Sequence, residues 1–202
     1  MSNENFDVSL KYVLVDEGGN DDDPRDHGGR TSRGITQREY DAWCHLNGKV
    51  AGDVWKASQT EIGSIYRSQY WEPYCNSLPN GLDYCFFDIS VNCGRSQAVK
   101  TFQKALGVPA DGMMGQITLA AINKADRIDL IHKVSDERRY FYRHLGQFAI
   151  YGKGWLSRVD HCEKQALAIS GGDQYHPATP TKKTPNDLWG ILGRLLQWLF
   201  KC

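Results

Sequence analysis

Carboxylates, glycines and threonines are concentrated between residues 17 and 36, in the segment EGGNDDDPRDHGGRTSRGIT. Glu17 opens this segment, and Asp26 precedes a pair of glycines by one residue. Glycoside hydrolysis normally uses two carboxyl groups, one as an acid and one as a base or nucleophile. We therefore predict Glu17 as the general acid and Asp26 as the second carboxylate, with three further aspartates of the loop as alternatives. A solvated Asp/Gly-rich turn without chemistry is the competing interpretation.

The residues before Glu17 predict the helix that would position it. Apolar side chains recur at helical spacing and form one face of a helix that ends at Glu17, namely Phe6, Leu10, Val13 and Leu14. Burial at the end of such a face disfavours a charged carboxylate, which suits a general acid. Gly18 and Gly19 can end the helix and leave backbone open to a substrate, so we predict both as substrate-binding residues.

Other polar residues of the loop have candidate roles. Thr31 and Thr36 could position a water molecule by hydrogen bonding, and we expect His27 to contact the substrate. The aspartates and His27 also raise the possibility of a metal site. Their spacing does not fit the calcium loop D-x-[DN]-x-[DN]-G-x5-E, so we predict no metal and no cofactor.

These residues resemble glycoside hydrolase family 108, the N-acetylmuramidases of the lysozyme-like superfamily found in phages and bacteria. The resemblance rests on fixed spacings of E-G-G, D-P, D-x-G-G-x-T and G-I-T, which begin here at Glu17, Asp23, Asp26 and Gly34. It implies cleavage of the β-1,4 bond between N-acetylmuramic acid and N-acetylglucosamine, with Glu17 as the catalytic acid. The chain departs from the family at Asn20 and Arg33, where the family usually has aromatic residues.

The resemblance continues downstream and covers about residues 6 to 169, including the family's peptidoglycan-binding half. The matching motifs are Tyr70-Trp71, Leu78-Pro79, Phe87-Asp88, Val91-Asn92, Gly94, Leu106-Gly107-Val108, Asp111-Gly112, Gly115 and Thr118. Tyr70 could stack on a sugar, although aromatic residues at helical spacing commonly form core. Asp88 and Asn92 lie four residues apart and could face one groove, or they could make buried hydrogen bonds between helices. The turn at residues 108–118 could contact glycan or simply join two helices.

The predicted fold class is mainly α, a lysozyme-like two-lobed helical fold with at most a short β element near residues 30–36. Ser58 and Glu61 form a capping box that opens one helix. Further helices are predicted from Leu82 to a stop at Gly94, from Ala98 to Leu106, from Gly115, over Leu130 to Ile150, and over Trp155 to Ile169. We divide the chain into a catalytic region at 1–93, a peptidoglycan-binding region at 94–170, a linker at 171–187 and a C-terminal helix at 188–202.

Composition fits a compact enzyme and argues against some partners. The chain has 202 residues, 41% of them hydrophobic, and a formal net charge of zero, which favours neither nucleic acid nor an anionic membrane. The N-terminus is polar and acidic, so we expect no secretory signal and folding in a cytoplasm. The six cysteines lack zinc-site spacing and are predicted to be reduced and mostly buried. We expect a monomer.

The C-terminal segment LWGILGRLLQWLFKC is amphipathic when drawn as a helix. It is too short to span a bilayer, so we predict an interfacial helix that contacts membrane or lipopolysaccharide. The residues predicted to make that contact are Trp189, Arg194, Trp198 and Lys201. The alternative is a helix that docks on the enzyme or on a second copy.

The functional prediction is a phage endolysin that is made in the bacterial cytoplasm and reaches the wall through a separate membrane pore. Its partner would be bacterial peptidoglycan. Three alternatives remain: a lytic transglycosylase, which leaves an anhydro sugar; a non-catalytic wall-binding or secretion-related protein; and a membrane-active lytic module.

Overall fold

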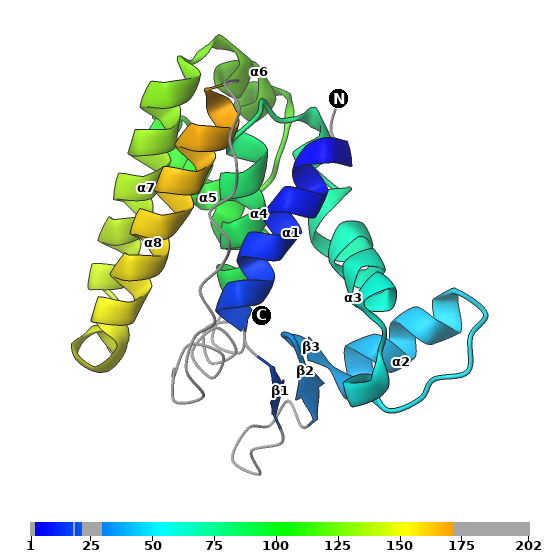
Figure 1. The fold of residues 1–202 in the computed structure, drawn as a ribbon. Coiled ribbons are helices and arrows are strands. Elements are labelled where there is room, and N and C mark those ends of the chain that lie inside the picture. Colours follow the sequence, from blue (N-terminus) through cyan, green and yellow to red (C-terminus); the bar gives the residue numbers. More distant parts are fainter. Residues whose placement is uncertain (1–2, 18, 22–29, 172–202) are drawn as a thin grey trace.

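A computed structural model describes residues 3–17, 19–21 and 30–171 of the chain. Helices dominate, and a three-stranded antiparallel sheet of very short strands lies beside the C-terminal end of the first helix (Figure 1). The elements are α1 (Asn3–Glu17), β1 (Asn20–Asp21), β2 (Thr31–Ser32), β3 (Ile35–Thr36), α2 (Gln37–Leu46), η1 (Val54–Lys56), α3 (Gln59–Tyr66), η2 (Arg67–Trp71), η3 (Cys75–Ser77), α4 (Leu82–Cys93), α5 (Arg95–Leu106), α6 (Gln116–Lys124), α7 (Arg127–Arg143) and α8 (Phe148–Ser170). The predicted mainly α class with a short β element is confirmed.

Helix α4 is the centre of the fold. Its sequence, LDYCFFDISVNC, is apolar on nearly every side, and all of its residues are buried. Helices α1, α5, α7 and α8 pack around it, and Gly94 ends it with a positive φ of 82°. A helix that is hydrophobic all round needs such a complete covering. The predicted stop at Gly94 is confirmed.

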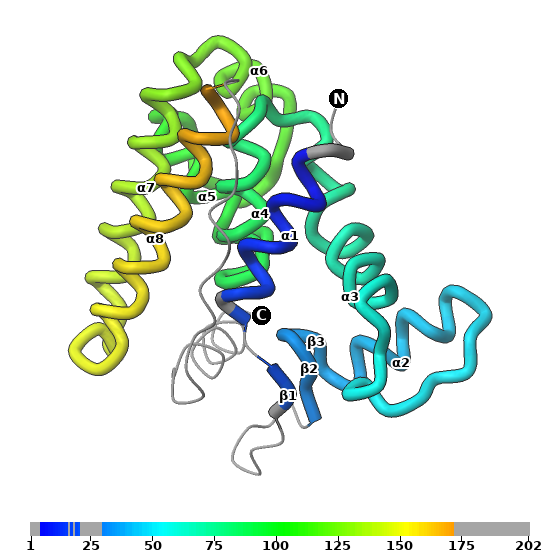
Figure 2. The backbone as a smooth tube through the Cα atoms, in the orientation of Figure 1, coloured from blue at the N-terminus to red at the C-terminus, as the bar shows by residue number. Residues whose placement is uncertain are grey.

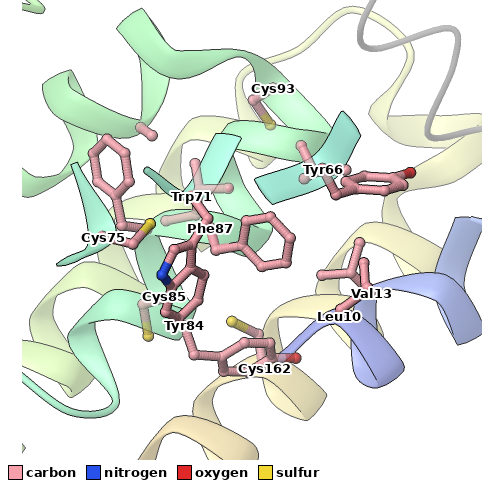
Figure 3. Close-up of a cluster of buried hydrophobic side chains, with 14 of the residues drawn as sticks. Leu10, Val13, Tyr66, Trp71, Cys75, Tyr84, Cys85, Phe87, Cys93 and Cys162 are labelled. Atoms are coloured by element: carbon pink, nitrogen blue, oxygen red, sulfur yellow. The ribbon is translucent and has the colours of Figure 1, made fainter. Parts of the chain in front are cut away.

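One continuous core joins the N-terminal and C-terminal parts of the chain. Aromatic rings of α1, η2 and α4 meet in it, with ring centroids 5.4 Å apart for both Phe6–Trp71 and Trp71–Phe87. The five cysteines of the described residues are free and buried, as predicted, and several of them line this cluster (Figure 3). The core then extends through α5 and α7 to Ala166 of α8. The predicted regions 1–93 and 94–170 therefore share one interior.

The prediction of one periodic segment over residues 130–150 and another helix over 155–169 is wrong at the boundary. Helix α7 ends at Arg143, and α8 runs without interruption from Phe148 to Ser170, so the two lie side by side as a hairpin (Figure 2). Gly152 does not break α8. It is buried under the Phe148 ring, and a methyl group at this position would lie 2.5 Å from carbon atoms of that ring.

Helix α2 was not predicted, yet its start carries a clear signal. Thr36 is its N-cap and forms a capping box with Glu39, the same arrangement that Ser58 and Glu61 make at the start of α3. The capping box predicted at Ser58 is confirmed. No helix in the described ranges is long and apolar enough to cross a membrane.

The cap of α3 is open to a stability test. Ser58→Ala removes the hydroxyl that accepts a hydrogen bond from the Glu61 backbone N–H, and should lower the free energy of unfolding by about 1 kcal/mol at pH 7. Ser64→Ala is the matched control inside the same helix, with an expected change within about 0.5 kcal/mol.

The difference in free energy of unfolding between wild type and Ser58→Ala should depend on pH. The backbone N–H of Ser58 contributes most to lowering the pKa of Glu61 to about 2, followed by the Lys49 ammonium and then the Ser58 hydroxyl, which is the only one of the three that Ser58→Ala removes. A lowered pKa contributes stability above the ordinary carboxyl pKa of 4.5, and that contribution is lost as pH falls toward 2. Urea unfolding at pH 7 and pH 2.5 should therefore show a smaller difference at the lower pH. An equal difference at both values would refute this account of the cap.

Candidate active site

Glu17 is the last residue of α1, and its side chain is almost completely buried, with 1% of its surface exposed. The apolar face before it is also buried, since Phe6, Leu10 and Val13 belong to the core. The helix end predicted from that face is confirmed. Burial of a lone carboxylate is costly unless other groups compensate its charge, so the neighbours of Glu17 decide what it can do.

The hairpin of β2 and β3 covers one side of the Glu17 carboxyl. Ser32 pairs with Ile35, and both residues of the turn have positive φ, 48° at Arg33 and 81° at Gly34. Positive φ at both central positions is the signature of a two-residue hairpin turn. The turn is fixed from two directions. The Tyr66 hydroxyl of α3 donates to the Arg33 carbonyl at 2.8 Å, and the Arg33 backbone N–H donates to Gly19 at 3.0 Å.

Gly34 brings the hairpin backbone into contact with the carboxyl group. A methyl group at position 34 would lie 3.0 Å from Oε2 of Glu17 and 2.5 Å from the hydroxyl oxygen of Tyr66. No side chain fits there without displacing one of these groups. The hairpin therefore approaches Oε2 as closely as a glycine allows.

A buried arginine of α8 contacts the other carboxyl oxygen. Nη1 of Arg158 donates to Oε1 of Glu17 at 3.1 Å, and Nη2 of the same guanidinium donates to Oδ1 of Asp88 at 2.8 Å. Arg138 of α7 completes the group with a 2.5 Å hydrogen bond from Nη1 to Oδ2 of Asp88. We call Glu17, Arg158, Asp88 and Arg138 the buried charge chain. All four side chains are buried.

The charge chain fixes the ionisation of Asp88. Burial alone would raise the pKa of this carboxyl, but the guanidinium groups of Arg158 and Arg138 outweigh it and lower the pKa to about 2. Asp88 is therefore ionised at neutral pH. Carboxyl and guanidinium groups alternate along the charge chain. Arg158 lies between the carboxyl groups of Glu17 and Asp88, and Asp88 lies between the guanidinium groups of Arg158 and Arg138.

Tyr66 and Tyr70 lie close enough to Glu17 for a negative charge on its carboxyl group to affect their pKa values. Burial, together with the negative charge of Glu17, raises the pKa of Tyr66 well above its ordinary value. Burial also raises the pKa of Tyr70, with contributions from Glu39 and Glu17. Both phenols are therefore neutral at physiological pH, and they can donate hydrogen bonds but cannot serve as bases.

Comparison with known proteins identifies the architecture. Residues 10–94 match the family model "Glycosyl hydrolase 108", and residues 97–160 match the model "Predicted Peptidoglycan domain". The solved structure of Brucella abortus SagA is 36% identical in sequence, with a TM-score of 0.72, and the match covers 84% of this chain and 98% of that one. The chain belongs to the glycosyl hydrolase 108 family. No functionally curated protein matches the sequence.

Membership in this family makes the chain a glycoside hydrolase with a peptidoglycan domain. The buried charge chain connects the two segments that the family models match. Glu17 and Asp88 lie in the segment matched as glycosyl hydrolase 108, whereas Arg138 and Arg158 lie in the segment matched as the peptidoglycan domain. The ion pairs therefore cross from one family segment to the other inside a shared core.

Of the predicted catalytic residues, Glu17 lies against the hairpin and Thr31 and Thr36 belong to its strands, whereas Asp26 is outside the described residues. Thr31 is fully buried in β2, and its carbonyl accepts a hydrogen bond from the Trp55 indole at 3.1 Å. The Thr36 hydroxyl is occupied by the capping box of α2, since it donates to Glu39 at 2.9 Å and accepts from the Glu39 backbone. Their role in positioning water stays a prediction. Asp26, His27 and Gly18 lie outside the described residues, while Gly19 is exposed and bonds the hairpin turn.

Two of the predicted substrate-binding residues, Asp88 and Asn92 of α4, are buried in the interior. Asp88 belongs to the charge chain, and Asn92 accepts a hydrogen bond from the Tyr142 hydroxyl at 2.5 Å. Of the two interpretations that the sequence left open, the structure has the buried hydrogen bonding between helices, so neither side chain faces a groove. Tyr70 is half-buried and packs on Tyr66 with a centroid distance of 5.7 Å. Trp189, Arg194, Trp198 and Lys201 lie outside the described residues.

The turn at residues 108–118 is built on a buried glutamine. The Gln103 side chain donates to Oδ1 of Asp111 at 2.7 Å and to Thr118 at 3.1 Å, and it accepts from the Gly112 backbone at 2.9 Å. Gly112 has the positive φ expected of a tight turn, 78°. Met113 and Ile117 project from this turn and are 70% and 71% exposed. Glycan contact there stays a prediction.

Sequence reasoning missed three residues that shape the site, Gly34, Tyr66 and Arg158. Gly34 was visible as part of the G-I-T motif but had no assigned role, and no role was predicted for Tyr66. Arg158 is 141 residues from Glu17 in sequence, and no local pattern indicates their contact. The described residues hold no cluster of three or more His, Cys, Asp or Glu side chains placed to bind a metal ion.

The close approach at Gly34 is testable by alanine substitution. Gly34→Ala and Gly48→Ala both place alanine at positive φ, but a methyl group on Gly48 meets nothing within 4 Å. We expect Gly48→Ala to lower the free energy of unfolding by about 1 kcal/mol and Gly34→Ala by about 1–3 kcal/mol more, because only the latter overpacks its surroundings. Thermal or urea unfolding measures both. Equal losses would mean that the hairpin can move away from Glu17 freely.

Proposed function

We propose that this protein hydrolyses the β-1,4 bond between N-acetylmuramic acid and N-acetylglucosamine in bacterial peptidoglycan, with Glu17 as the general acid. The observation that carries the proposal is the buried Glu17 carboxyl, held at the end of α1 between Arg158 and the Gly34 turn. Membership in glycosyl hydrolase family 108 and the adjoining peptidoglycan domain support the substrate class.

The proposed reaction begins with proton transfer from Glu17 to the glycosidic oxygen. The bond between that oxygen and the anomeric carbon then breaks, its electron pair stays on the oxygen, and the sugar becomes oxocarbenium-like. Water completes the reaction at the anomeric carbon. Asp26 is proposed to accept its proton or to stabilise the positive charge, and Thr31 or Thr36 to orient it. Tyr66 and Tyr70 are unsuited to the base role because both phenols keep their protons.

The biological role that we propose is that of an endolysin, made in the cytoplasm and released to the wall through a separate pore. In this proposal residues 188–202 contact membrane or lipopolysaccharide through Trp189, Arg194, Trp198 and Lys201, beyond a linker at 171–187. The separation of this segment from the core helices by a Pro- and Gly-containing stretch favours such a role over core packing.

The acid role of Glu17 predicts a specific set of products. Wild type should release muropeptides with reducing ends from purified peptidoglycan, and Glu17→Gln should lower the release by at least about 100-fold, since glutamine cannot donate the proton. Glu72→Gln, which changes an exposed carboxyl, should behave as wild type. Mass spectrometry of the soluble fragments measures all three.

Other products would assign other functions. Anhydro-muropeptides from wild type would indicate a lytic transglycosylase. Fragments at an undiminished rate from Glu17→Gln would remove Glu17 from the acid role. A wild type that binds the wall and releases nothing would be a binding protein.

The proposed role of the tail predicts a difference between substrates. A chain ending at Ser170 should hydrolyse purified peptidoglycan as fast as the full chain, because α8 and the core are complete at that point. It should act at least about 10-fold more slowly on intact cells with an outer membrane, where the full chain can use its amphipathic end. Turbidity of whole cells and release from purified walls measure the two rates.

Either of two results would contradict this division. Loss of activity on purified peptidoglycan would mean that the tail belongs to the enzyme or that lysis is a membrane effect. Equal rates on intact cells would remove the membrane role.

A further inference from the structure

Arg158 contacts Glu17 directly. It lies outside the E-G-G to G-I-T motif, and it is not one of the two carboxyl groups that glycoside hydrolysis normally uses. Nη1 of Arg158 lies 3.1 Å from Oε1 of Glu17, and both side chains are shielded from solvent, with 3% and 0% exposure. An ion pair at this depth interacts more strongly than one at the surface, because water screens it little. Arg158 therefore acts on the charge of Glu17 directly.

Arg158 is itself held in one orientation. Its Nε and Nη2 donate to Oδ1 of Asp88 at 3.1 Å and 2.8 Å, so the guanidinium spans two carboxyl groups. Asp88 is held from its other oxygen by Arg138, whose Nε donates to the Tyr142 hydroxyl at 3.0 Å. Side chains locked by such supporting contacts can hold a reacting group in position.

We propose that Arg158 is a positioning residue for Glu17: it holds Oε1, fixes the orientation of the carboxyl group in this way, and stabilises the carboxylate left after proton transfer. This inference rests on the proposed function. When the proton moves from Glu17 to the glycosidic oxygen, the negative charge that develops on the carboxyl group lies beside a guanidinium already in place. A preorganised charge of this kind lowers the barrier without reorganisation.

The groups around Glu17 act in opposite directions on its proton. Burial favours the neutral acid, and the negative charge of Asp88, on the far side of Arg158, acts in the same direction. Arg158 of α8 favours the carboxylate, and the neutral phenols of Tyr66 and Tyr70 carry no charge. Removal of Arg158 should therefore make Glu17 hold its proton to higher pH and release it less readily.

The first test measures the ionisation of Glu17 without using activity. Carbon-13 NMR of the glutamate side-chain carboxyls, with Glu17 assigned by its absence in Glu17→Gln, gives the titration midpoint. Arg158→Met should raise this midpoint by about one pH unit or more, and Arg158→Lys should raise it less because it keeps the cation. Arg139→Met is the matched control, because Arg139 also bridges α7 and α8 but pairs with Asp136, Asp160 and Glu163 and not with Glu17 or Asp88. It should leave the midpoint unchanged.

The second test measures catalysis on peptidoglycan fragments. Arg158→Met should lower kcat by about 10–100-fold, leave KM within about threefold, and move the alkaline limb of the pH profile upward with the midpoint. Arg158→Lys should recover part of kcat. A merely structural loss would lower the amount of active enzyme without moving the pH profile.

An unchanged Glu17 midpoint in folded Arg158→Met overturns the inference, whatever the activity. If that variant does not fold, the wild type supplies the test: the guanidinium nitrogen signals of Arg158 should follow the Glu17 titration and lose that step in Glu17→Gln. Signals that do not follow it overturn the inference too. A midpoint that shifts in a protein releasing no fragments would instead support the control of Glu17 by Arg158 and refute the muramidase proposal.

Discussion

The buried charge chain is the interaction on which the arrangement of this protein depends. Carboxyl groups of α1 and α4 alternate with guanidinium groups of α8 and α7, and all four side chains are removed from water. Any one of these charges would be costly alone in that interior. Together they fix the relative positions of four helices, because a shift of one helix would leave a neighbouring charge without compensation.

The same chain makes one structural unit of two segments that family models match separately. Residues 10–94 hold Glu17, yet the guanidinium beside its carboxyl group comes from residues 97–160. The hydrophobic core is also continuous between the two segments. A peptidoglycan domain that only recruited substrate would need neither feature. Here Arg158 of α8, held through Asp88 by Arg138 of α7, contacts one oxygen of the Glu17 carboxyl, while the hairpin covers the other oxygen.

Structural features that depend on residues close together in the sequence, such as helix faces and helix caps, could be predicted from the sequence. Apolar spacing predicted the helix that ends at Glu17, and Ser58 and Glu61 predicted the start of α3. The capping box of Thr36 and Glu39 was equally readable and was missed, together with α2. The loop between α7 and α8 lies between Arg143 and Phe148, whereas the sequence placed it between Ile150 and Trp155. Gly152 falls inside α8, where the Phe148 ring packs against it, and this contact has no signature in the apolar pattern. The pairing of Asp88 with Arg158 joins residues 70 positions apart and has no local signature.

If Glu17 is the general acid that we propose, both its burial and the charges around it must be specified. A carboxyl in a purely apolar pocket keeps its proton too firmly, and one beside a cation in water gives it up before the substrate arrives. Here the end of α1 and the Gly34 turn exclude water, and Arg158 opposes their effect from the opposite oxygen. Since Asp88 and Arg138 hold Arg158 in place, the balance is set by residues that need not touch a sugar. Substitutions of Arg138 in α7 or Asp88 in α4 should therefore reach Glu17 through Arg158, and those of Asp88 also through the loss of its own negative charge.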